Sequence, residues 1–168
     1  MIIGGLDVGT SGVKCVLFDE KGTVLCRTHR EYSYTSDGGQ YCLDANNVLQ
    51  SSCEVLSEAA HTVNSPIDGI GVSAIGESCV LLDENDRVLG NSILYNDHRG
   101  FDESEKITAR LGSREIFERT GVRPNGTYSI EKLMWIRGNE AYWDRVNKIL
   151  LFEDFIIYKL TGNRLISY

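Results

Sequence analysis

A short acidic, glycine-containing segment near the start of the chain most constrains how this sequence can fold: Asp7-Val8-Gly9-Thr10-Ser11-Gly12-Val13-Lys14. The apolar residues before it, at 2–6, predict a short buried strand, and those at 13–18 predict a second strand that runs back. The segment from Asp7 to Gly12 is then the turn of a hairpin. An acid and a cation, Asp7 and Lys14, flank this turn.

The predicted turn carries groups that suit phosphate. Glycine at Gly9 and Gly12 allows positive φ and a close approach to a ligand, and Thr10 and Ser11 add hydroxyl donors. Asp7 alone would repel a phosphate by about 4 kcal/mol, for unit charges about 4 Å apart at an effective dielectric of about 20. Mg²⁺ would remove this repulsion, because it accepts one carboxylate together with waters and nucleotide phosphates. We therefore predict a phosphate and metal site with Asp7 as the metal-holding residue; the alternative is an ordinary hairpin with a solvated aspartate.

The rest of the pattern predicts an α/β layered sheet. A third strand is predicted at 23–26, and Asp44 can cap a helix that continues to Asn64-Ser65-Pro66. Strands follow at 67–75 and 79–82, with a hairpin turn at 83–86. The second half favours helices at 107–111, at 116–117 with Ser113 as the cap, at 133–136 and at 155–160.

Composition narrows the class of protein. The 168 residues are 42% hydrophobic and 24% charged, which is typical of a globular protein with a core. The net charge of -7 and the lack of clustered Lys and Arg argue against nucleic acid as a partner. No basic leader and no apolar run of membrane-spanning length is visible, so we expect a cytoplasmic protein with no membrane partner.

The order of several motifs resembles one known family. Asp-x-Gly-Thr-Ser-Gly-x-Lys followed by a Phe-Asp-x-x-Gly hairpin is similar to the first phosphate motif of the FGGY carbohydrate kinases, and the chain resembles the xylulokinases of that family. Further similar segments follow in the expected order: Gly71 to Ser78, Tyr95-Asn96-Asp97-His98-Arg99 in place of Trp-x-Asp-x-Arg, Lys132-Leu133-x-Trp135, and Leu160-Thr161-Gly162. The resemblance covers essentially the whole chain.

This resemblance implies a ribonuclease-H-like, actin-like ATPase fold, with residues 1–168 as a truncated first domain of a two-domain sugar kinase. The implied activity is transfer of the γ-phosphoryl group of ATP, with Mg²⁺, to a hydroxyl of a small sugar or polyol. A ketopentose such as xylulose leads among the acceptors. Asp7, Gly9, Thr10, Ser11 and Lys14 are the implied cofactor-binding residues.

On the acceptor side, the resemblance points to Glu77, Tyr95, Asp97, Arg99 and Tyr128. Xylulokinases usually have Gln-Met-His where this chain has Ile75-Gly76-Glu77, whereas glycerol kinases have Gln-Arg-Glu, so neither pattern is intact. A carboxylate can accept two hydrogen bonds from vicinal hydroxyls, although a surface strand residue is the alternative for Glu77. If the 95–99 segment is extended, Tyr95, Asp97 and Arg99 share one face, where one can hold the sugar and another brace it.

The family's catalytic base is an aspartate of a downstream Gly-Asp-Gln or Gly-Asp-Asn segment, which we expect to lie beyond Tyr168. We therefore expect negligible kinase activity from these 168 residues alone. Ser167 stands where many relatives have an aspartate. Three alternatives remain open: a glycerol- or gluconate-type kinase of the same family, an actin- or chaperone-type ATPase, and a catalytically silent binding protein of this fold. Exposed sheet edges would also allow a homodimer.

Overall fold

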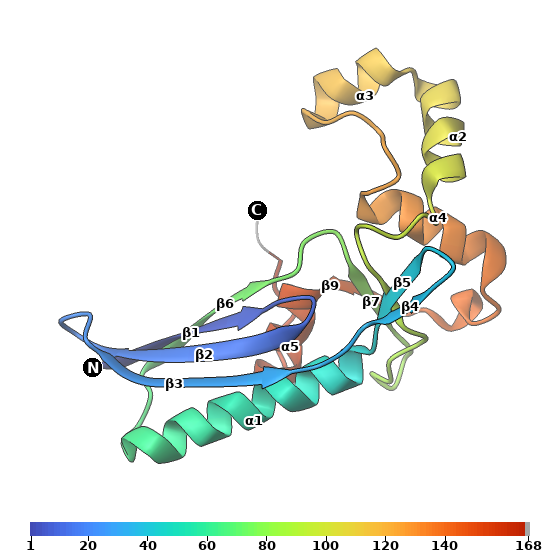
Figure 1. Cartoon of the computed structure of the whole chain (residues 1–168). Coiled ribbons are helices and arrows are strands. Elements are labelled where there is room, and N and C mark those ends of the chain that lie inside the picture. The colour runs from blue at the N-terminus through green and yellow to red at the C-terminus, as the bar shows by residue number, and fades with distance from the viewer. Residues whose placement is uncertain (167–168) are drawn as a thin grey trace. The chain divides into compact units, whose positions relative to one another are not determined.

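The computed structural model describes residues 1–166, so the prediction for Ser167 lies outside the described residues. The chain divides into two compact units (Figure 1). The first unit contains residues 1–34, 43–76 and the chain from Leu150 onward, and the second contains residues 35–42 and 77–149. Among the described residues, no helix combines the length and apolarity required to cross a membrane.

A four-stranded sheet forms the base of the first unit. Its strand order is β3 (Val24–Glu31), β2 (Gly12–Asp19), β1 (Ile2–Val8) and β6 (Gly69–Ala74). β1 runs antiparallel to β2 and parallel to β6, as expected for a hairpin followed by a crossover helix. Side chains alternate along these strands, and the buried set is Leu6, Val8, Val13, Cys15, Leu17, Cys26 and Thr28.

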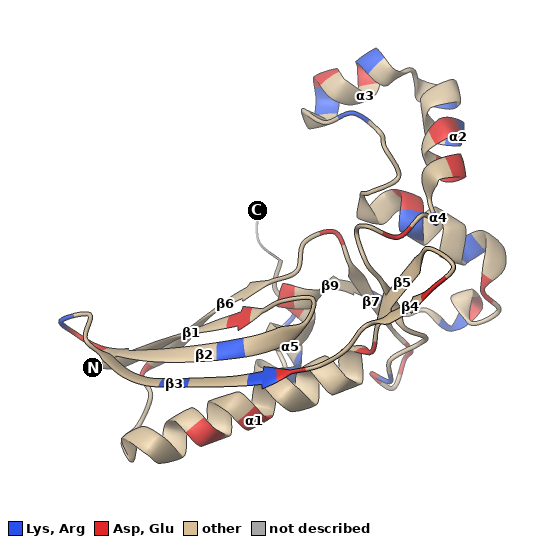
Figure 2. Ribbon diagram, in the orientation of Figure 1, with Lys and Arg blue, Asp and Glu red and all other residues tan. Residues whose placement is uncertain are grey.

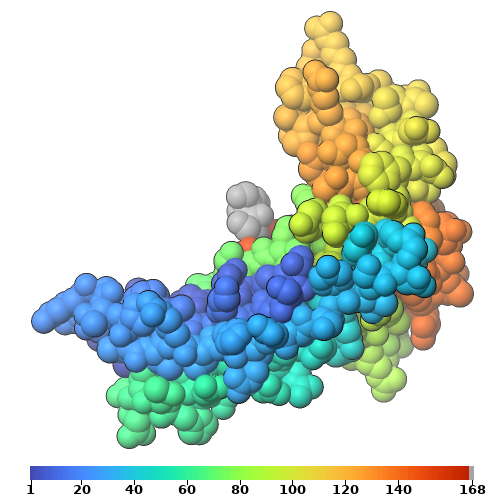
Figure 3. All heavy atoms as spheres, in the orientation of Figure 1, coloured from blue at the N-terminus to red at the C-terminus, as the bar shows by residue number. Residues whose placement is uncertain are grey.

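Two helices belong to this unit. α1 (Ala45–Val63) packs on β1, β2 and β3, and α5 (Phe152–Thr161) packs on β6. In the space-filling view, α1 in green lies directly against the blue strands (Figure 3). Asp44 accepts a hydrogen bond from the N–H of Asn46, and Asn64 ends the helix in the left-handed conformation, which confirms both predicted ends of α1.

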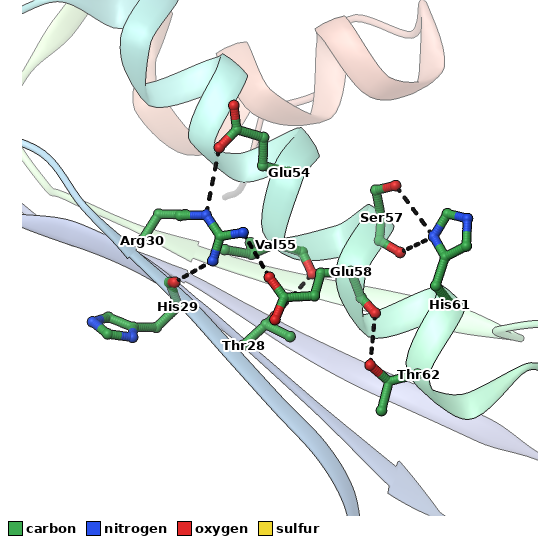
Figure 4. A network of polar contacts seen from close by, with 9 residues as sticks. All are labelled: Thr28, His29, Arg30, Glu54, Val55, Ser57, Glu58, His61 and Thr62. Carbon is green, nitrogen blue, oxygen red and sulfur yellow. Dashed lines mark hydrogen bonds and ion pairs between the residues drawn. The ribbon is translucent and has the colours of Figure 1, made fainter.

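Side chains also tie β3 to α1 (Figure 4). The buried hydroxyl of Thr28 donates to the Val55 carbonyl at 2.8 Å. Arg30 contacts two successive acidic positions of the helix, Glu54 at 3.5 Å and Glu58 at 2.7 Å. β3 is an edge strand of this sheet, so these contacts fix it on the helix where only one strand partner supports it.

The second unit combines small sheets with helices. β4 (Thr35–Asp37), β5 (Gln40–Leu43) and β8 (Ser92–Ile93) form one sheet, and β7 (Cys79–Leu82) pairs with β9 (Lys148–Leu151). The helices are α2 (Phe101–Leu111), α3 (Ser113–Thr120), α4 (Ser129–Asn139) and a 3₁₀ turn at Trp143–Arg145. Its core contains Leu81, Leu89, Ile93 and Ile136.

The predicted elements are present, with local corrections. The turn after β7 is confirmed, because the Asp83 carboxylate accepts from the N–H groups of Asn85 and Arg87. The prediction that Ser113 caps a helix was wrong, because Ser113 is the first residue of α3. Gly112 occupies the cap position and makes no side-chain hydrogen bond there. α5 begins at Phe152, earlier than predicted, because its first turn is buried against the core of its unit.

Candidate functional site

The first candidate site lies at the end of the β1–β2 hairpin. Asp7 is part of β1, so the turn is shorter than the sequence indicated. Strand register places Asp7 opposite Lys14 on one side and Ser73 on the other, with His29 opposite Lys14. Figure 2 shows an acidic residue of β1 beside a basic residue of β2. A polar row therefore crosses the sheet on the face opposite its buried side chains.

A hollow of about 560 Å³, here called the phosphate hollow, opens beside this row. Four of the five residues predicted to bind the cofactor line it: Asp7, Gly9, Ser11 and Lys14. Thr10 is not among the lining residues. The others are Gly12, His29, Glu31, Tyr32 and Ser33.

The turn that borders the phosphate hollow is held from inside and from β3. The Gly9 N–H donates to the Gly12 carbonyl at 2.9 Å. The Tyr32 hydroxyl donates to the Gly9 carbonyl at 2.7 Å, and the Tyr32 N–H donates to the Ser11 carbonyl at 3.1 Å. Burial, and then the charge of Asp7, raises the pKa of Tyr32, so its phenol keeps the proton that it donates.

The positive φ predicted for the two glycines was wrong, while their close approach to a ligand stays a prediction. Neither Gly9 nor Gly12 takes a positive φ. Gly12 is instead required by a close approach of strands, because a Cβ there would lie 2.6 Å from the Arg30 carbonyl oxygen. At Gly9 a Cβ would lie 3.2 Å from the Gly12 carbonyl oxygen, so the turn itself leaves little room for a side chain.

The donor set of the phosphate hollow fits Mg²⁺ bound together with phosphates. Asp7 supplies one exposed carboxylate, while Lys14 and the Ser11 hydroxyl can meet phosphate oxygens. Among the described residues, no group of three or more His, Cys, Asp or Glu could hold a metal without further ligands. One carboxylate with water and phosphate ligands is the arrangement that Mg²⁺ accepts in nucleotide sites.

The second candidate site is a hollow of about 280 Å³ in the second unit, here called the Glu77 hollow. It brings together Glu77 and Tyr128, two of the five residues predicted to bind the acceptor. Its walls are otherwise mainly apolar, and the remaining lining residues are Ile107, Ile116, Thr120, Val122, Pro124, Ser129, Ile130 and Glu131. A carboxylate among apolar walls can orient a small ligand that has both hydroxyls and a C–H face.

Glu77 lies in the bend between β6 and β7 and has a positive φ of 55°. This conformation is uncommon for a residue with a side chain and costs about 1 kcal/mol or more. Its Oε2 accepts hydrogen bonds from the Ser129 N–H at 2.8 Å and from the Ser129 hydroxyl at 3.0 Å. The carboxylate thus lies at the positive N-terminal end of α4, which stabilises its charge.

The predicted shared face of Tyr95, Asp97 and Arg99 was wrong, because the segment is a turn and not an extended strand. Tyr95 is 47% exposed, whereas Asp97 is 1% exposed. Asp97 accepts from the Arg99 N–H, Nε and Nη2 and from the Tyr41 N–H, at 2.6 to 2.9 Å. Both of its oxygens therefore accept hydrogen bonds from protein donors that hold the turn, and its contact with an acceptor stays a prediction.

The Lys-Leu-x-Trp motif of α4 explains how this turn is held. Lys132 Nζ donates to the carbonyls of Asp97 and Arg99, and the Arg99 guanidinium lies 5.0 Å from the Trp135 ring centroid. Lys132 and Trp135 are three residues apart on a helix, so they face the same side. Burial lowers the pKa of Lys132, and the charge of Asp97 opposes that change. Two motifs distant in the sequence therefore form one packing unit.

Sequence reasoning missed three residues at these sites: His29, Tyr32 and Glu131. His29 could have been found from strand alternation, because it lies directly opposite Lys14 in the register of β2 and β3. Tyr32 follows β3 and has no local signal that points to the hairpin turn. Glu131 had no signal either, because a charged residue in the first turn of a helix usually faces solvent.

Comparison with known proteins identifies the family. Residues 2–168 match the N-terminal domain of the FGGY family of carbohydrate kinases, so the chain belongs to this family. A xylulose kinase of Lactococcus lactis is 32% identical over 167 residues, which cover 95% of this chain and 32% of that protein. A glycerol kinase of Gloeobacter violaceus is 30% identical over 161 residues, with 95% of this chain and 32% of that protein covered.

Solved structures agree with this assignment. The crystal structure of xylulose kinase from Rhodospirillum rubrum matches with a TM-score of 0.95 at 28% identity, covering 99% of this chain and 36% of that chain. The predicted ribonuclease-H-like, actin-like ATPase fold is therefore confirmed. The chain spans about a third of the length of these relatives.

Proposed function

We propose that this chain supplies phosphate-binding and acceptor-binding residues of an ATP-dependent carbohydrate kinase whose acceptor is a ketopentose such as xylulose. The reaction is transfer of the ATP γ-phosphoryl group to an acceptor hydroxyl. Such transfer depends on positioning and on neutralising the charge of the phosphates, with little covalent chemistry for the protein to perform. The xylulose kinases among the relatives support this choice of acceptor.

In the phosphate hollow, Asp7 would hold Mg²⁺, and Lys14 and Ser11 would meet phosphate oxygens. Bound Mg²⁺ supplies neutralisation of phosphate charge. Tyr32 holds the backbone of this turn in place through the hydrogen bond that its hydroxyl donates to the Gly9 carbonyl. Thr10 lies in the same turn and remains a proposed phosphate contact, although it does not line the phosphate hollow.

The single observation that carries the acceptor proposal is the geometry of Glu77. Its backbone is held at a φ of 55° while both hydrogen bonds to Ser129 use Oε2. Oε1 would accept a hydrogen bond from an acceptor hydroxyl, and Tyr128 would offer an aromatic wall for the C–H face of a sugar. Strain of this kind is retained where the position of a side chain matters for function.

A glycerol-type acceptor is the second candidate. Glu77 stands where xylulokinases usually have a histidine, and a glycerol kinase is among the relatives at 30% identity. A carboxylate accepts hydrogen bonds from vicinal hydroxyls of either acceptor, so Glu77 alone does not choose between them. Arg99, beside the bracing Asp97, and the exposed Tyr95 are proposed as additional acceptor contacts.

The test measures acceptor-dependent ADP formation by the complete gene product with xylulose, glycerol and gluconate. For Glu77→Ala we expect the acceptor KM to rise at least tenfold, because one hydrogen bond to a charged group contributes about 1.5–3 kcal/mol. The ATP KM should stay unchanged. Glu84→Ala, at an exposed turn position, is the matched control and should leave both KM values unchanged. An unchanged acceptor KM in Glu77→Ala would show that the assignment of Glu77 is wrong.

A further inference from the structure

Glu131 is a buried acid that the proposed chemistry does not yet use. It lies in the first turn of α4, two positions after Ser129, and is 2% exposed. It lines the same hollow as Glu77 and Tyr128. An acid at this depth is uncommon, because glutamate is almost never fully buried unless it is paired.

The carboxyl of Glu131 is only partly satisfied by the protein. Backbone N–H groups of Gly126 and of Glu131 itself interact with it. Its Oε2, however, has no hydrogen-bond partner among the described residues. A buried oxygen without a partner costs about 1–3 kcal/mol, so a residue that retains one at the wall of a hollow needs an explanation.

Nearby packing holds the backbone and Cβ of Glu131 in place. A Cβ on Gly100 would come within 3.2 Å of the Glu131 Cβ, and Gly100 has a φ of 104°. Gly126 has a φ of 76°, and a Cβ there would come within 2.9 Å of the Phe101 ring. Gly100, in a conformation that disfavours side chains, therefore brings the chain against Glu131, and Gly126 makes a similar close approach to the neighbouring Phe101.

We infer that Glu131 is a second acceptor-binding residue, whose carboxyl donates a hydrogen bond to a ligand hydroxyl in the Glu77 hollow. This inference rests on the proposed function, because the ligand it requires is a small molecule with neighbouring hydroxyls. One hydroxyl donates to the Glu77 carboxylate, and its neighbour accepts from Glu131. The two acids then bind the two hydroxyls of a diol, Glu77 as the hydrogen-bond acceptor and Glu131 as the hydrogen-bond donor.

The protonation of Glu131 supports this division of roles. Burial raises the pKa of Glu131, and the charge of Glu77 raises it further, against the opposing effects of the backbone hydrogen bonds and of Lys132. Two carboxylates that share one apolar site favour a state with a single proton. A protonated carboxyl is a hydrogen-bond donor, which a carboxylate is not.

The test compares Glu131→Gln with Glu131→Met in the complete gene product. Gln keeps a neutral donor in the same position, so the acceptor KM should stay within about threefold of the wild-type value. Met keeps the volume and removes the donor, so the acceptor KM should rise about tenfold, the effect of one hydrogen bond, while the ATP KM stays unchanged. Glu105→Gln and Glu105→Met, at an exposed position of α2, are the matched controls.

Acceptor analogues that each lack one hydroxyl complete the test. With the wild-type protein, the analogue that lacks the hydroxyl bound by Glu131 should have a higher KM than the complete acceptor. With Glu131→Met, the KM values of this analogue and of the complete acceptor should be equal. If the Met variant does not fold, Glu131→Asp withdraws the carboxyl by one methylene and should show the same acceptor-specific rise.

The inference is overturned if Glu131→Met or Glu131→Asp leaves the acceptor KM unchanged, or lowers only the melting temperature and kcat. A wild-type protein that forms no ADP with any acceptor would instead overturn the proposed function, and the inference with it.

Discussion

Asp97 is the most consequential buried acid in the second unit, and its replacement should destabilise that unit strongly. Its side chain has 0% relative exposure, and its ion-pair partner Arg99 has 12%. Asp97→Ala would leave a nearly buried guanidinium without its carboxylate and would remove the hydrogen bond that Asp97 accepts from the Tyr41 N–H. Removing one partner of a buried ion pair costs about 3–5 kcal/mol.

Tryptophan fluorescence reports this loss selectively. Both tryptophans of the chain, Trp135 and Trp143, belong to the second unit, and Trp135 contacts the Arg99 guanidinium. With a urea m-value of about 2 kcal/mol per M, a loss of about 4 kcal/mol lowers the unfolding midpoint by about 2 M. Arg114→Ala breaks an exposed pair with Glu118 and should shift the midpoint by less than about 0.3 M. A comparable shift in both variants would refute the reasoning.

The pH dependence of stability provides an independent check on Asp97. Burial alone would raise the pKa of Asp97, but hydrogen bonds from Arg99 and then Tyr41 outweigh burial and hold the pKa below its usual value. A carboxyl with a lowered folded-state pKa stabilises the fold above its unfolded pKa of about 3.9, and this contribution is lost as the pH falls through the folded value. The difference in unfolding free energy between wild type and Asp97→Asn should therefore be constant from about pH 7 to 5 and shrink below about pH 4. A difference that grows on acidification would contradict this assignment.

Three further substitutions test the remaining contacts. Gly12→Ala places a Cβ 2.6 Å from a carbonyl oxygen of β3 and should cost about 1–3 kcal/mol in thermal melts, whereas Gly5→Ala, with nothing within 4 Å, should cost less than about 0.5 kcal/mol; equal costs would contradict the close approach. Tyr32→Phe removes a hydrogen bond to the phosphate turn and should raise the ATP KM of the complete gene product about threefold to tenfold, with an unchanged acceptor KM. An unchanged ATP KM would refute that role. Lys132→Met leaves two carbonyls unpaired and should lower the free energy of unfolding by about 1–3 kcal/mol, measured by tryptophan fluorescence, while Arg110→Met, at an exposed position of α2, should not.

Local signals in the sequence were sufficient for the β1–β2 hairpin strands and the two ends of α1 in the first unit. The apolar alternation in β1 and β2, the Asp44 cap and the Asn64 stop are short-range features, and the structure contains all of them. The close approach behind Gly12 was not readable, because it depends on the position of β3 and not on the turn.

For the Asp97 region, the sequence pattern was not sufficient to predict the structure. The alternation of residues 95–99 suggested an extended segment, but the chain turns there. The Asp97 carboxylate accepts hydrogen bonds from the N–H and side chain of Arg99 and from the N–H of Tyr41 in β5. Such a turn is stabilised by partners far apart in the sequence, including Lys132. Likewise, the close approach of Gly100 to the buried Glu131 is a contact that only the folded chain reveals.

The central proposal is that residues of this chain bind phosphate and a hydroxylated acceptor for phosphoryl transfer. The most direct measurement is ADP formation by the complete gene product, with ATP and Mg²⁺, in the presence and absence of xylulose, glycerol or gluconate. We predict that ADP forms only when an acceptor is present, with xylulose the best of the three, and that Glu77→Ala raises the acceptor KM at least tenfold. ATP hydrolysis at the same rate without any acceptor, or no ADP formation with all three, would contradict the proposal.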